Sequence, residues 1–246
     1  MTKANDVLLV TGGSRGIGAA IVRKAVARGA RVCFSYARDR AAADELVREL
    51  GGGVMAVQGD VADAAFAAEC FDRAEASLGI VTALVNNAGV TGPIGRFKDV
   101  THATMRRTYD VNVLGTMLTA QEAIRRWERA GIAGRIVNVS SIASTLGAPN
   151  EYVHYAASKA AVEAFTIGLA KEVAASGVRV NAVAPGTAFT GIHAAAGEPD
   201  RPARVVARVP IGRIAAPDEI ANAVLWLLSS EASYVTGAVL RVSGGL

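Results

Sequence analysis

Short apolar, β-branched runs alternate with stretches of helical periodicity along nearly the whole chain. Neighbouring parallel strands need a crossover connection, usually a helix, so this alternation predicts a parallel sheet with helices on both faces. We therefore expect an α/β fold, a Rossmann-like doubly wound sheet of about seven strands. The expected strands are residues 7–11, 31–36, 54–58, 81–85, 135–140, 179–184 and 238–242, and the longer expected helices are 39–50, 63–77, 102–129 and 155–175.

One domain accounts for the length of the chain. Its 246 residues, 51% of them hydrophobic, suffice for one large core, so we expect a single domain over residues 1–246. One stretch, 187–210, is rich in alanine, glycine, proline and charge and lacks clean periodicity. Because it follows a strand, we predict a mobile lid over a substrate, with a plain connecting insertion as the alternative.

Composition argues against several classes of function. The net charge of +4 comes from scattered Lys and Arg residues and only 5% of residues are aromatic, so no nucleic-acid partner is expected. No run approaches 18 apolar residues and no signal-like leader opens the sequence, which predicts a cytoplasmic protein without a membrane partner. Cys33 and Cys70 lie in apolar surroundings and are expected to be buried thiols of a reducing compartment. No metal site is expected.

The first expected strand runs directly into a glycine-rich turn, TGGSRGIG. Gly12, Gly16 and Gly18 would let the backbone turn tightly and approach a diphosphate, whose charge is favoured by free N–H groups and the helix dipole. The spacing is Gly-x3-Gly-x-Gly rather than the commoner Gly-x-Gly-x-x-Gly, and an ordinary strand-to-helix turn is the alternative. Its position after the first strand favours a nucleotide site.

A tyrosine and a lysine stand four residues apart in HYAASKAA. One helical turn brings Tyr155 and Lys159 onto the same face. A neighbouring cation favours a phenolate, so the pair is predicted to exchange a proton with a substrate oxygen nearer neutral pH than a free tyrosine would. An exposed amphipathic turn is the alternative.

Six motifs together resemble the short-chain dehydrogenase/reductase family. They are TGGSRGIG at 11–18, NNAG at 86–89, Asn112 in DVNVLGT, the serines of IVNVSS, YAASK at 155–159 and NAVAPG at 181–186. Their order, their spacing and the total length agree over essentially the whole chain, with similarity to 3-oxoacyl-[acyl-carrier-protein] reductase-like and glucose dehydrogenase-like members. The resemblance implies a nicotinamide-dependent oxidoreductase that moves a hydride between the cofactor and a carbonyl or secondary alcohol carbon.

The resemblance also implies roles for four residues. Tyr155 would be the acid/base, and Lys159 would lower its pKa and hold the ribose. Asn112 would kink its helix and maintain a proton relay to Lys159, and Ser141 would position the substrate oxygen. Ser140 is the alternative to Ser141, because the loop before Tyr155 is one residue longer than the family's common pattern. Tyr152 and His154 flank the site, and His154 is equally expected to serve packing.

Strand two ends without the acidic residue that enzymes selecting NAD usually carry. Tyr36 stands there, and Arg38 and Arg15 offer guanidinium groups to a 2′-phosphate, so NADP(H) is preferred over NAD(H). Asp39 complicates this, because it could reach a ribose hydroxyl. Asp60 resembles the family's adenine contact, with a helix cap as the alternative. The resemblance implies cofactor binding by Gly12, Ser14, Arg15, Gly16, Ile17, Gly18, Tyr36, Arg38, Asp60, Val61, Asn87, Ala88, Gly89, Tyr155, Lys159, Pro185, Gly186 and Thr190.

Substrate and assembly are predicted from the same resemblance. Ile132 and Ser176 stand where reductases of carrier-bound acyl chains often have arginine, although Arg126, Arg129 and Lys171 lie close enough to substitute. We therefore expect a free small carbonyl or alcohol, sugar-like ones included. A 3-oxoacyl-[acyl-carrier-protein] reductase is the alternative, and a non-catalytic NADP-binding regulator a remote one. A homotetramer is expected through the apolar faces of 102–129, 155–175 and 217–230.

Overall fold

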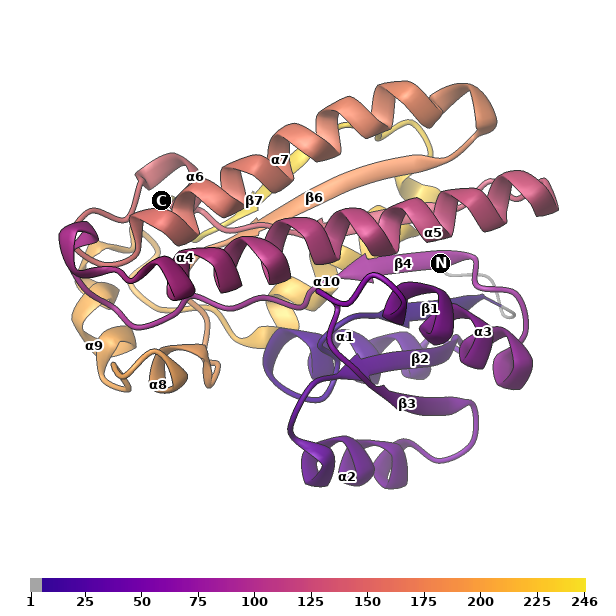
Figure 1. Cartoon of the computed structure of the whole chain (residues 1–246), viewed down its shortest axis with the longest axis horizontal. Helices are drawn as coiled ribbons and strands as arrows, with labels where there is room; N and C mark the ends of the chain where they lie inside the picture. Colours follow the sequence, from indigo (N-terminus) through magenta and orange to yellow (C-terminus); the bar gives the residue numbers. More distant parts are fainter. Residues whose placement is uncertain (1–5) are drawn as a thin grey trace.

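The strands of the chain form one parallel sheet (Figure 1) in the computed structural model, which describes residues 6–246. The order across the sheet is β3-β2-β1-β4-β5-β6-β7, and each neighbouring pair is parallel. The strands are β1 (Val7–Val10), β2 (Arg31–Tyr36), β3 (Val54–Gln58), β4 (Ala83–Asn86), β5 (Arg135–Val139), β6 (Arg179–Pro185) and β7 (Val239–Val242). The predicted Rossmann-like doubly wound fold is confirmed.

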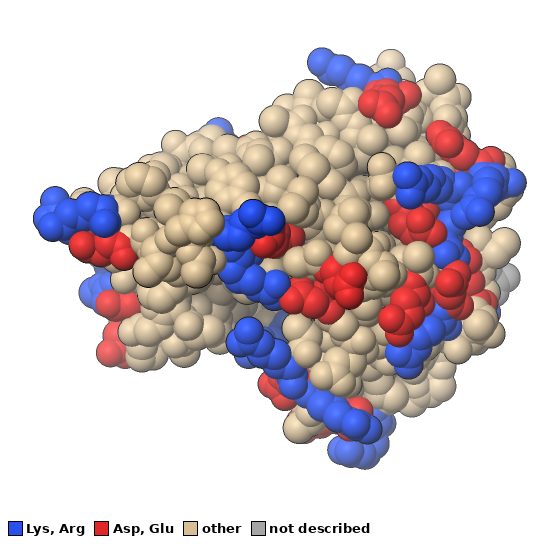
Figure 2. Space-filling model, viewed as in Figure 1, with Lys and Arg blue, Asp and Glu red and all other residues tan. Residues whose placement is uncertain are grey.

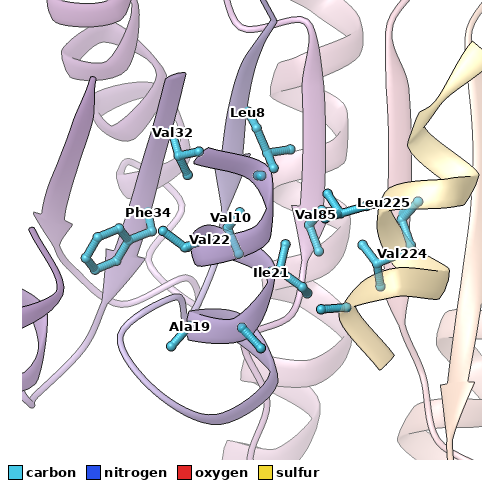
Figure 3. Packing of buried hydrophobic residues seen from close by; sticks show 14 of the residues in the cluster. Leu8, Val10, Ala19, Ile21, Val22, Val32, Phe34, Val85, Val224 and Leu225 are labelled. Carbon is cyan, nitrogen blue, oxygen red and sulfur yellow. The ribbon is translucent and has the colours of Figure 1, made fainter. Parts of the chain in front are cut away.

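Helices cover both faces of this sheet, which explains why strands such as β1 are buried from end to end. The helices are α1 (Gly16–Ala27), α2 (Arg40–Leu50), α3 (Phe66–Leu78), α4 (His102–Tyr109), α5 (Gly115–Ala130), α6 (Ala143–Leu146), α7 (Val153–Val173), α8 (Ile192–Ala195), α9 (Arg201–Val205) and α10 (Pro217–Leu228). One hydrophobic cluster joins α1, α2 and α10 to the sheet, and a second joins α3, α5 and α7 to its other face. Figure 3 shows Ile21 of α1 and Leu225 of α10 converging on Val85 of β4.

The strand order reverses its direction of growth between β1 and β4. The chain leaves β1 toward β2 on one side, whereas β4 leads away toward β5 on the other. In open parallel sheets the connections on either side of such a point separate and leave a crevice at the carboxyl ends of the strands. The glycine-rich turn after β1 and the NNAG motif at the end of β4 both lie there.

The helix expected over 102–129 is interrupted. It consists of α4, a π-helical turn Asp110–Leu114 (η2) and α5. π turns are rare and lie mostly at functional sites. Asn112, a poor helix former, is fully buried within this turn, so the kink expected of it takes the form of a π turn.

The segment 187–210 folds into α8, α9 and a 3₁₀ turn, Val206–Arg208. It lies with α6 and the start of α4 at one end of the molecule in Figure 1, and the Ala188 and Ala215 backbones pair at its base. Elsewhere, Cys33 and Cys70 are buried free thiols. No helix within residues 6–246 is long and apolar enough to cross a membrane.

Candidate active site

A cavity of about 820 Å³ opens at the carboxyl ends of the strands. Its size falls within the roughly 300–1,000 Å³ of typical ligand sites. Figure 2 shows the hollow between the part of the molecule that carries α8 and α9 and the part that carries α2, with Lys and Arg atoms along its borders. Each predicted site residue except Asn112 lines this cavity, from Gly12 in the first turn to Thr190 in the segment 187–210.

The glycine-rich turn is packed so closely that side chains would not fit. A Cβ atom on Gly18 would lie 2.2 Å from the Gly12 carbonyl oxygen, and one on Gly12 would lie 2.9 Å from the Ala88 Cα. Gly12 also has a φ of 65°, a backbone conformation that favours glycine. The Asn87 side chain donates hydrogen bonds of 2.9 Å to the carbonyl oxygens of both Thr11 and Gly12. The turn is thus held open toward the cavity, as a cradle for a diphosphate requires.

Two arginines expected at the 2′-phosphate position are exposed on the rim of the cavity. Arg15 lies at the start of α1 and Arg38 follows β2, where Tyr36 is buried. The Asp39 carboxylate accepts a hydrogen bond of 3.1 Å from the Ala42 backbone N–H and caps α2. This acid, exposed beside Arg38, is thus engaged by the first turn of α2.

Asp60 forms an ion pair that the sequence did not suggest. Its Oδ2 lies 2.7 Å from Nη1 of Arg107 on α4, and its Oδ1 accepts a hydrogen bond of 3.0 Å from the Ala62 N–H. Burial raises the pKa of the Asp60 carboxyl, but the bonds from Arg107 and Ala62 outweigh burial and lower it. The helix-cap alternative for Asp60 is wrong, because α3 begins only at Phe66.

Tyr155 and Lys159 are both buried on α7, with exposed fractions of 8% and 4%. The Lys159 Nζ lies 5.8 Å from the centre of the Tyr155 ring and donates a hydrogen bond of 2.7 Å to the Val139 carbonyl. Burial lowers the Lys159 pKa to about 8, opposed by the negative charge of Glu163. The ammonium is therefore still the main form at neutral pH.

The prediction that the Tyr155 pKa is lowered is wrong for this geometry. Burial raises the pKa of the phenol, and this outweighs the opposing effects of the Ser141 hydrogen bond and the Arg201 charge. The physical reason is desolvation, which penalises a phenolate more than these two groups stabilise it. The spacing of Tyr155 and Lys159 gave no indication of burial, because spacing reports the face of a helix and not its surroundings.

The two serines at the end of β5 point to different neighbours. The Ser140 hydroxyl is buried and donates to Glu163 Oε1 at 2.7 Å. The Ser141 hydroxyl lies at the cavity, hydrogen-bonded to the Tyr155 phenol, and accepts a bond of 3.1 Å from the Ala143 N–H. The longer loop therefore leaves Ser141 beside Tyr155.

Asn112 lies behind the cavity rather than in its wall. Its side-chain amide donates 2.9 Å bonds to the Val90 carbonyl and to the Ser158 hydroxyl, and its Oδ1 accepts a 2.8 Å bond from the Val90 N–H. A Cβ atom placed on Gly89 would lie 3.4 Å from both Asn112 Oδ1 and Lys159 Nζ. Asn112 thus joins the π turn, the loop after β4 and α7 directly behind Lys159.

Sequence reasoning missed the charged groups that other elements bring to the cavity. Arg107 of α4, Glu151 of the loop before α7 and Arg201 of α9 all line it. Only their charge marked them in the sequence, and charge alone does not separate them from surface residues. His154 is buried with Nε2 2.8 Å from the Thr91 carbonyl oxygen, in keeping with the packing alternative. Among the side chains that the structure describes, no group of three or more His, Cys, Asp or Glu residues could hold a metal ion.

Known proteins share both the sequence and the fold. The sequence profile described as Enoyl-(Acyl carrier protein) reductase matches residues 12–246. Cis-4-hydroxycyclohexanecarboxylate dehydrogenase of Sinomonas cyclohexanicum is 42% identical over 246 residues, covering 98% of this chain and 96% of that protein.

Solved structures agree over the same length. The 3-ketoacyl-(acyl-carrier-protein) reductase of Brucella melitensis, complexed with NADH, superposes with a TM-score of 0.91 at 30% identity, covering 98% of this chain and 97% of that one. A blue fluorescent protein from a metagenomic library, in complex with NADPH, superposes with a TM-score of 0.88 at 36% identity and the same coverage. With the profile match and the strand order, these similarities make the chain a member of the short-chain dehydrogenase/reductase family of oxidoreductases.

Proposed function

We propose that the protein is an NADP(H)-dependent oxidoreductase that interconverts a small ketone or aldehyde and its alcohol, with Tyr155 as the acid/base. The observation that carries this proposal is the arrangement in one cavity of the Tyr155 phenol, the Ser141 hydroxyl bonded to it and the Lys159 ammonium. A neutral proton donor, a second donor and a cation at one point are what reduction of a carbonyl requires. An intact set of these groups argues against a non-catalytic regulator.

The cavity fits a nicotinamide dinucleotide, because its volume is about 820 Å³ and the glycine-rich turn, which admits no side chain at Gly12 or Gly18, forms part of its wall. When bound, the dinucleotide supplies or accepts the hydride. In reduction, the Tyr155 and Ser141 hydroxyls hydrogen-bond the substrate oxygen, and Tyr155 gives it a proton as negative charge develops there. Burial keeps Tyr155 protonated at neutral pH, which suits a donor. The Lys159 charge then stabilises the phenolate left behind.

The rim of the cavity supports NADP(H) as the preferred cofactor. Arg15 and Arg38 are both exposed there and offer charged donors to a 2′-phosphate. Asp39, the acid that complicates the choice, is occupied in capping α2. Both NADH and NADPH complexes occur among the similar structures, so the preference rests on these residues of the chain itself.

The surface supports a free small substrate over a carrier-bound one. Arg126, which could substitute for the arginine missing at Ile132, is engaged by Asp72, Glu75 and Glu122 at 2.6–2.8 Å. A guanidinium so neutralised is a poor partner for an acidic carrier protein. The Sinomonas relative, named for a small alicyclic alcohol, fits this interpretation. The alternative, a 3-oxoacyl-[acyl-carrier-protein] reductase, is favoured by the structural similarity to the Brucella enzyme.

A substrate panel followed at the NADPH absorbance band tests the function. We would measure kcat/KM at low salt, with each cofactor, for five substrates: cyclohexanone, cyclohexanol, ethyl acetoacetate, D-glucose and acetoacetyl carrier protein. We expect a small ketone or alcohol to give the highest kcat/KM. A hundredfold advantage for the carrier-linked substrate that falls as salt is added would favour the alternative, since steering by opposite charges weakens with ionic strength. No turnover of any carbonyl or alcohol would contradict both.

The role of Ser141 is tested against its neighbour. We expect Ser141→Ala to lower kcat far more than Ser140→Ala, because only the Ser141 hydroxyl bonds Tyr155 at the cavity. Ser140→Ala should act mainly on stability through its lost bond to Glu163. Thermal unfolding and kcat measured on both variants separate the two effects. A larger kcat loss in Ser140→Ala would show that the longer loop has exchanged the two roles.

We also propose a homotetramer. Four large apolar side chains on the surface are 39–48% exposed: Tyr109 on α4, Leu114 beside it, Ile167 on α7 and Trp226 on α10. They lie on the helices expected to form the subunit contacts. Burial of such faces between subunits would remove apolar surface from water.

A further inference from the structure

A partly buried ion pair fastens the segment 187–210 to the loop before Tyr155. Arg201 of α9 is 8% exposed, and its guanidinium meets the Glu151 carboxylate through Nε–Oε1 at 3.1 Å, Nε–Oε2 at 3.2 Å and Nη2–Oε2 at 2.6 Å. A forked guanidinium–carboxylate pair of this kind fixes direction as well as distance. Burying it is costly unless both partners remain engaged, so separating them would leave an unpaired charge in the cavity wall.

The loop that carries Glu151 is held in an uncommon conformation. Ala148 and Asn150 have φ values of 46° and 61°, in the left-handed region that non-glycine residues rarely adopt. The Glu151 carbonyl accepts a hydrogen bond of 2.8 Å from Gly95, and the Ala196 carbonyl of the segment 187–210 accepts one of 3.3 Å from Ile94. Three segments far apart in the sequence therefore meet at this loop, and Arg201 supplies the charged contact among them.

The same guanidinium is connected to Tyr155 through an aromatic contact. The Arg201 Cζ lies 5.1 Å from the centre of the Tyr152 ring, within the range of a cation–π contact. The Tyr152 ring meets the Tyr155 ring edge-on, with 5.2 Å between ring centres and 86° between their planes. Tyr152 is buried, so its ring position depends on the groups on both sides of it.

Arg201 affects Tyr155 through its charge as well as through packing. The polar and charged groups around the Tyr155 side chain are the Ser141 hydroxyl from the end of β5, Lys159 from its own helix, the Tyr152 phenol and Arg201 from α9, with Glu151 beside Arg201. The Arg201 charge favours a phenolate at Tyr155. Arg201 thus acts on both the position and the protonation of this residue.

We propose that Arg201 is a positioning residue: by docking on Glu151 and Tyr152 it closes the segment 187–210 over the substrate and holds Tyr155 ready for proton transfer. The proposal rests on the proposed function, in which Tyr155 is the acid/base. Closure of the segment 187–210 and proton transfer by Tyr155 then depend on each other, because the same Arg201–Glu151 pair closes the cavity and supports the Tyr155 ring. Substrate that does not permit the pair to form would not be turned over efficiently.

Variants of the pair, with a matched control, test this. Arg204 lies one helical turn from Arg201 on α9, is exposed and pairs with Glu198, outside the cavity lining. We would compare five variants in the reduction of the small ketone that gives the highest kcat/KM in the substrate panel. They are Arg201→Gln, Glu151→Gln, the double variant, Arg201→Lys and Arg204→Gln. NADPH fluorescence gives the cofactor Kd, and hydrogen exchange reports opening of residues 187–210 without any substrate.

We expect Arg201→Gln to lower kcat at least tenfold, raise the substrate KM, speed exchange in 187–210 and leave the NADPH Kd within twofold. The pH midpoint of kcat for alcohol oxidation should move upward, since a phenolate then forms less readily. The double variant should be no worse than either single one, because the pair acts as a unit. Arg201→Lys should recover part of the loss, and Arg204→Gln should match the wild type in all these measurements.

Other outcomes would overturn the proposal. Any of three results would show that Arg201 serves the stability of α9 alone. These are losses of kcat that add in the double variant, equal effects of Arg201→Gln and Arg204→Gln, and a pH profile of kcat that does not shift. A variant that fails to fold is recognised by thermal unfolding, and Arg201→Lys then decides, because it keeps the charge and loses the fork. Failure of the proposed function differs from all of these, since it would show as full turnover in Tyr155→Phe.

Discussion

Replacing Tyr155 with phenylalanine should remove nearly all turnover, a loss of about 10²–10⁴-fold in kcat, while the fold and the NADPH affinity are retained. The phenol is buried, borders the cavity and is hydrogen-bonded to Ser141, so it is the group placed to pass a proton to a substrate oxygen there. Phenylalanine keeps the ring that packs edge-on against Tyr152 and removes only the hydroxyl. Steady-state kcat, NADPH fluorescence titration and thermal unfolding measure the three quantities.

The control for this variant is a tyrosine far from the cavity. Tyr234 is fully exposed and does not line the site, so Tyr234→Phe should match the wild type. Because burial raises the Tyr155 pKa, the wild-type rate of ketone reduction should be constant through neutral pH as far as this group is concerned, and fall only as the phenol ionises. Wild-type kcat in Tyr155→Phe would falsify the acid/base assignment.

Exchanging Arg38 for aspartate should erase much of the preference for NADPH over NADH. The wild type should use NADPH with the higher kcat/KM, because Arg38 stands exposed on the cavity rim with Asp39 occupied in the cap of α2. A hydrogen bond to a charged group contributes about 1.5–3 kcal/mol, which corresponds to roughly ten- to hundredfold in kcat/KM. An aspartate would in addition repel the 2′-phosphate and bind the ribose hydroxyls of NADH.

A neighbouring arginine provides the matched control for this exchange. Arg40 is exposed at the start of α2, pairs with Asp44 and does not line the cavity. Arg40→Asp should therefore change both cofactors alike. Equal kcat/KM for the two cofactors in the wild type, or an equal shift in both aspartate variants, would refute the assignment to Arg38.

The fold was predictable because its signals are local. β1 is a run of apolar residues followed directly by a glycine-rich turn, and both are visible in consecutive residues. Parallel strands with helical crossovers then restrict the topology to few choices. Interruptions within elements were less predictable, as η2 shows, because a π turn differs from an α turn by a single extra residue and the hydrogen-bond register that accompanies it.

The site was predictable where a motif carries its own geometry and not where two segments meet. The spacing of Tyr155 and Lys159 guarantees a common helical face, and Ser141 follows from the end of a strand. Arg201 and Glu151 lie far apart in the sequence, and only the folded chain brings them together as an ion pair. The direction of the shift in the Tyr155 pKa was missed for the same reason, since every element around the phenol contributes to its desolvation.

The π turn at Asp110–Leu114 has a consequence for how the chain tolerates changes in length. A π turn contains one residue more than an α turn, so the extra residue is taken up within η2 and α4 and α5 continue as one rod. Removing one residue here would restore an uninterrupted α-helix whose two halves keep nearly the same alignment, because five residues of a π turn and four of an α-helix each cover about one turn. The loss would be local: removal of Asn112 itself would abolish the bonds to Val90 and Ser158, whereas Arg107 would stay opposite Asp60. The π turn therefore lets a buried amide be added to a helix without moving the side chains on either side of it.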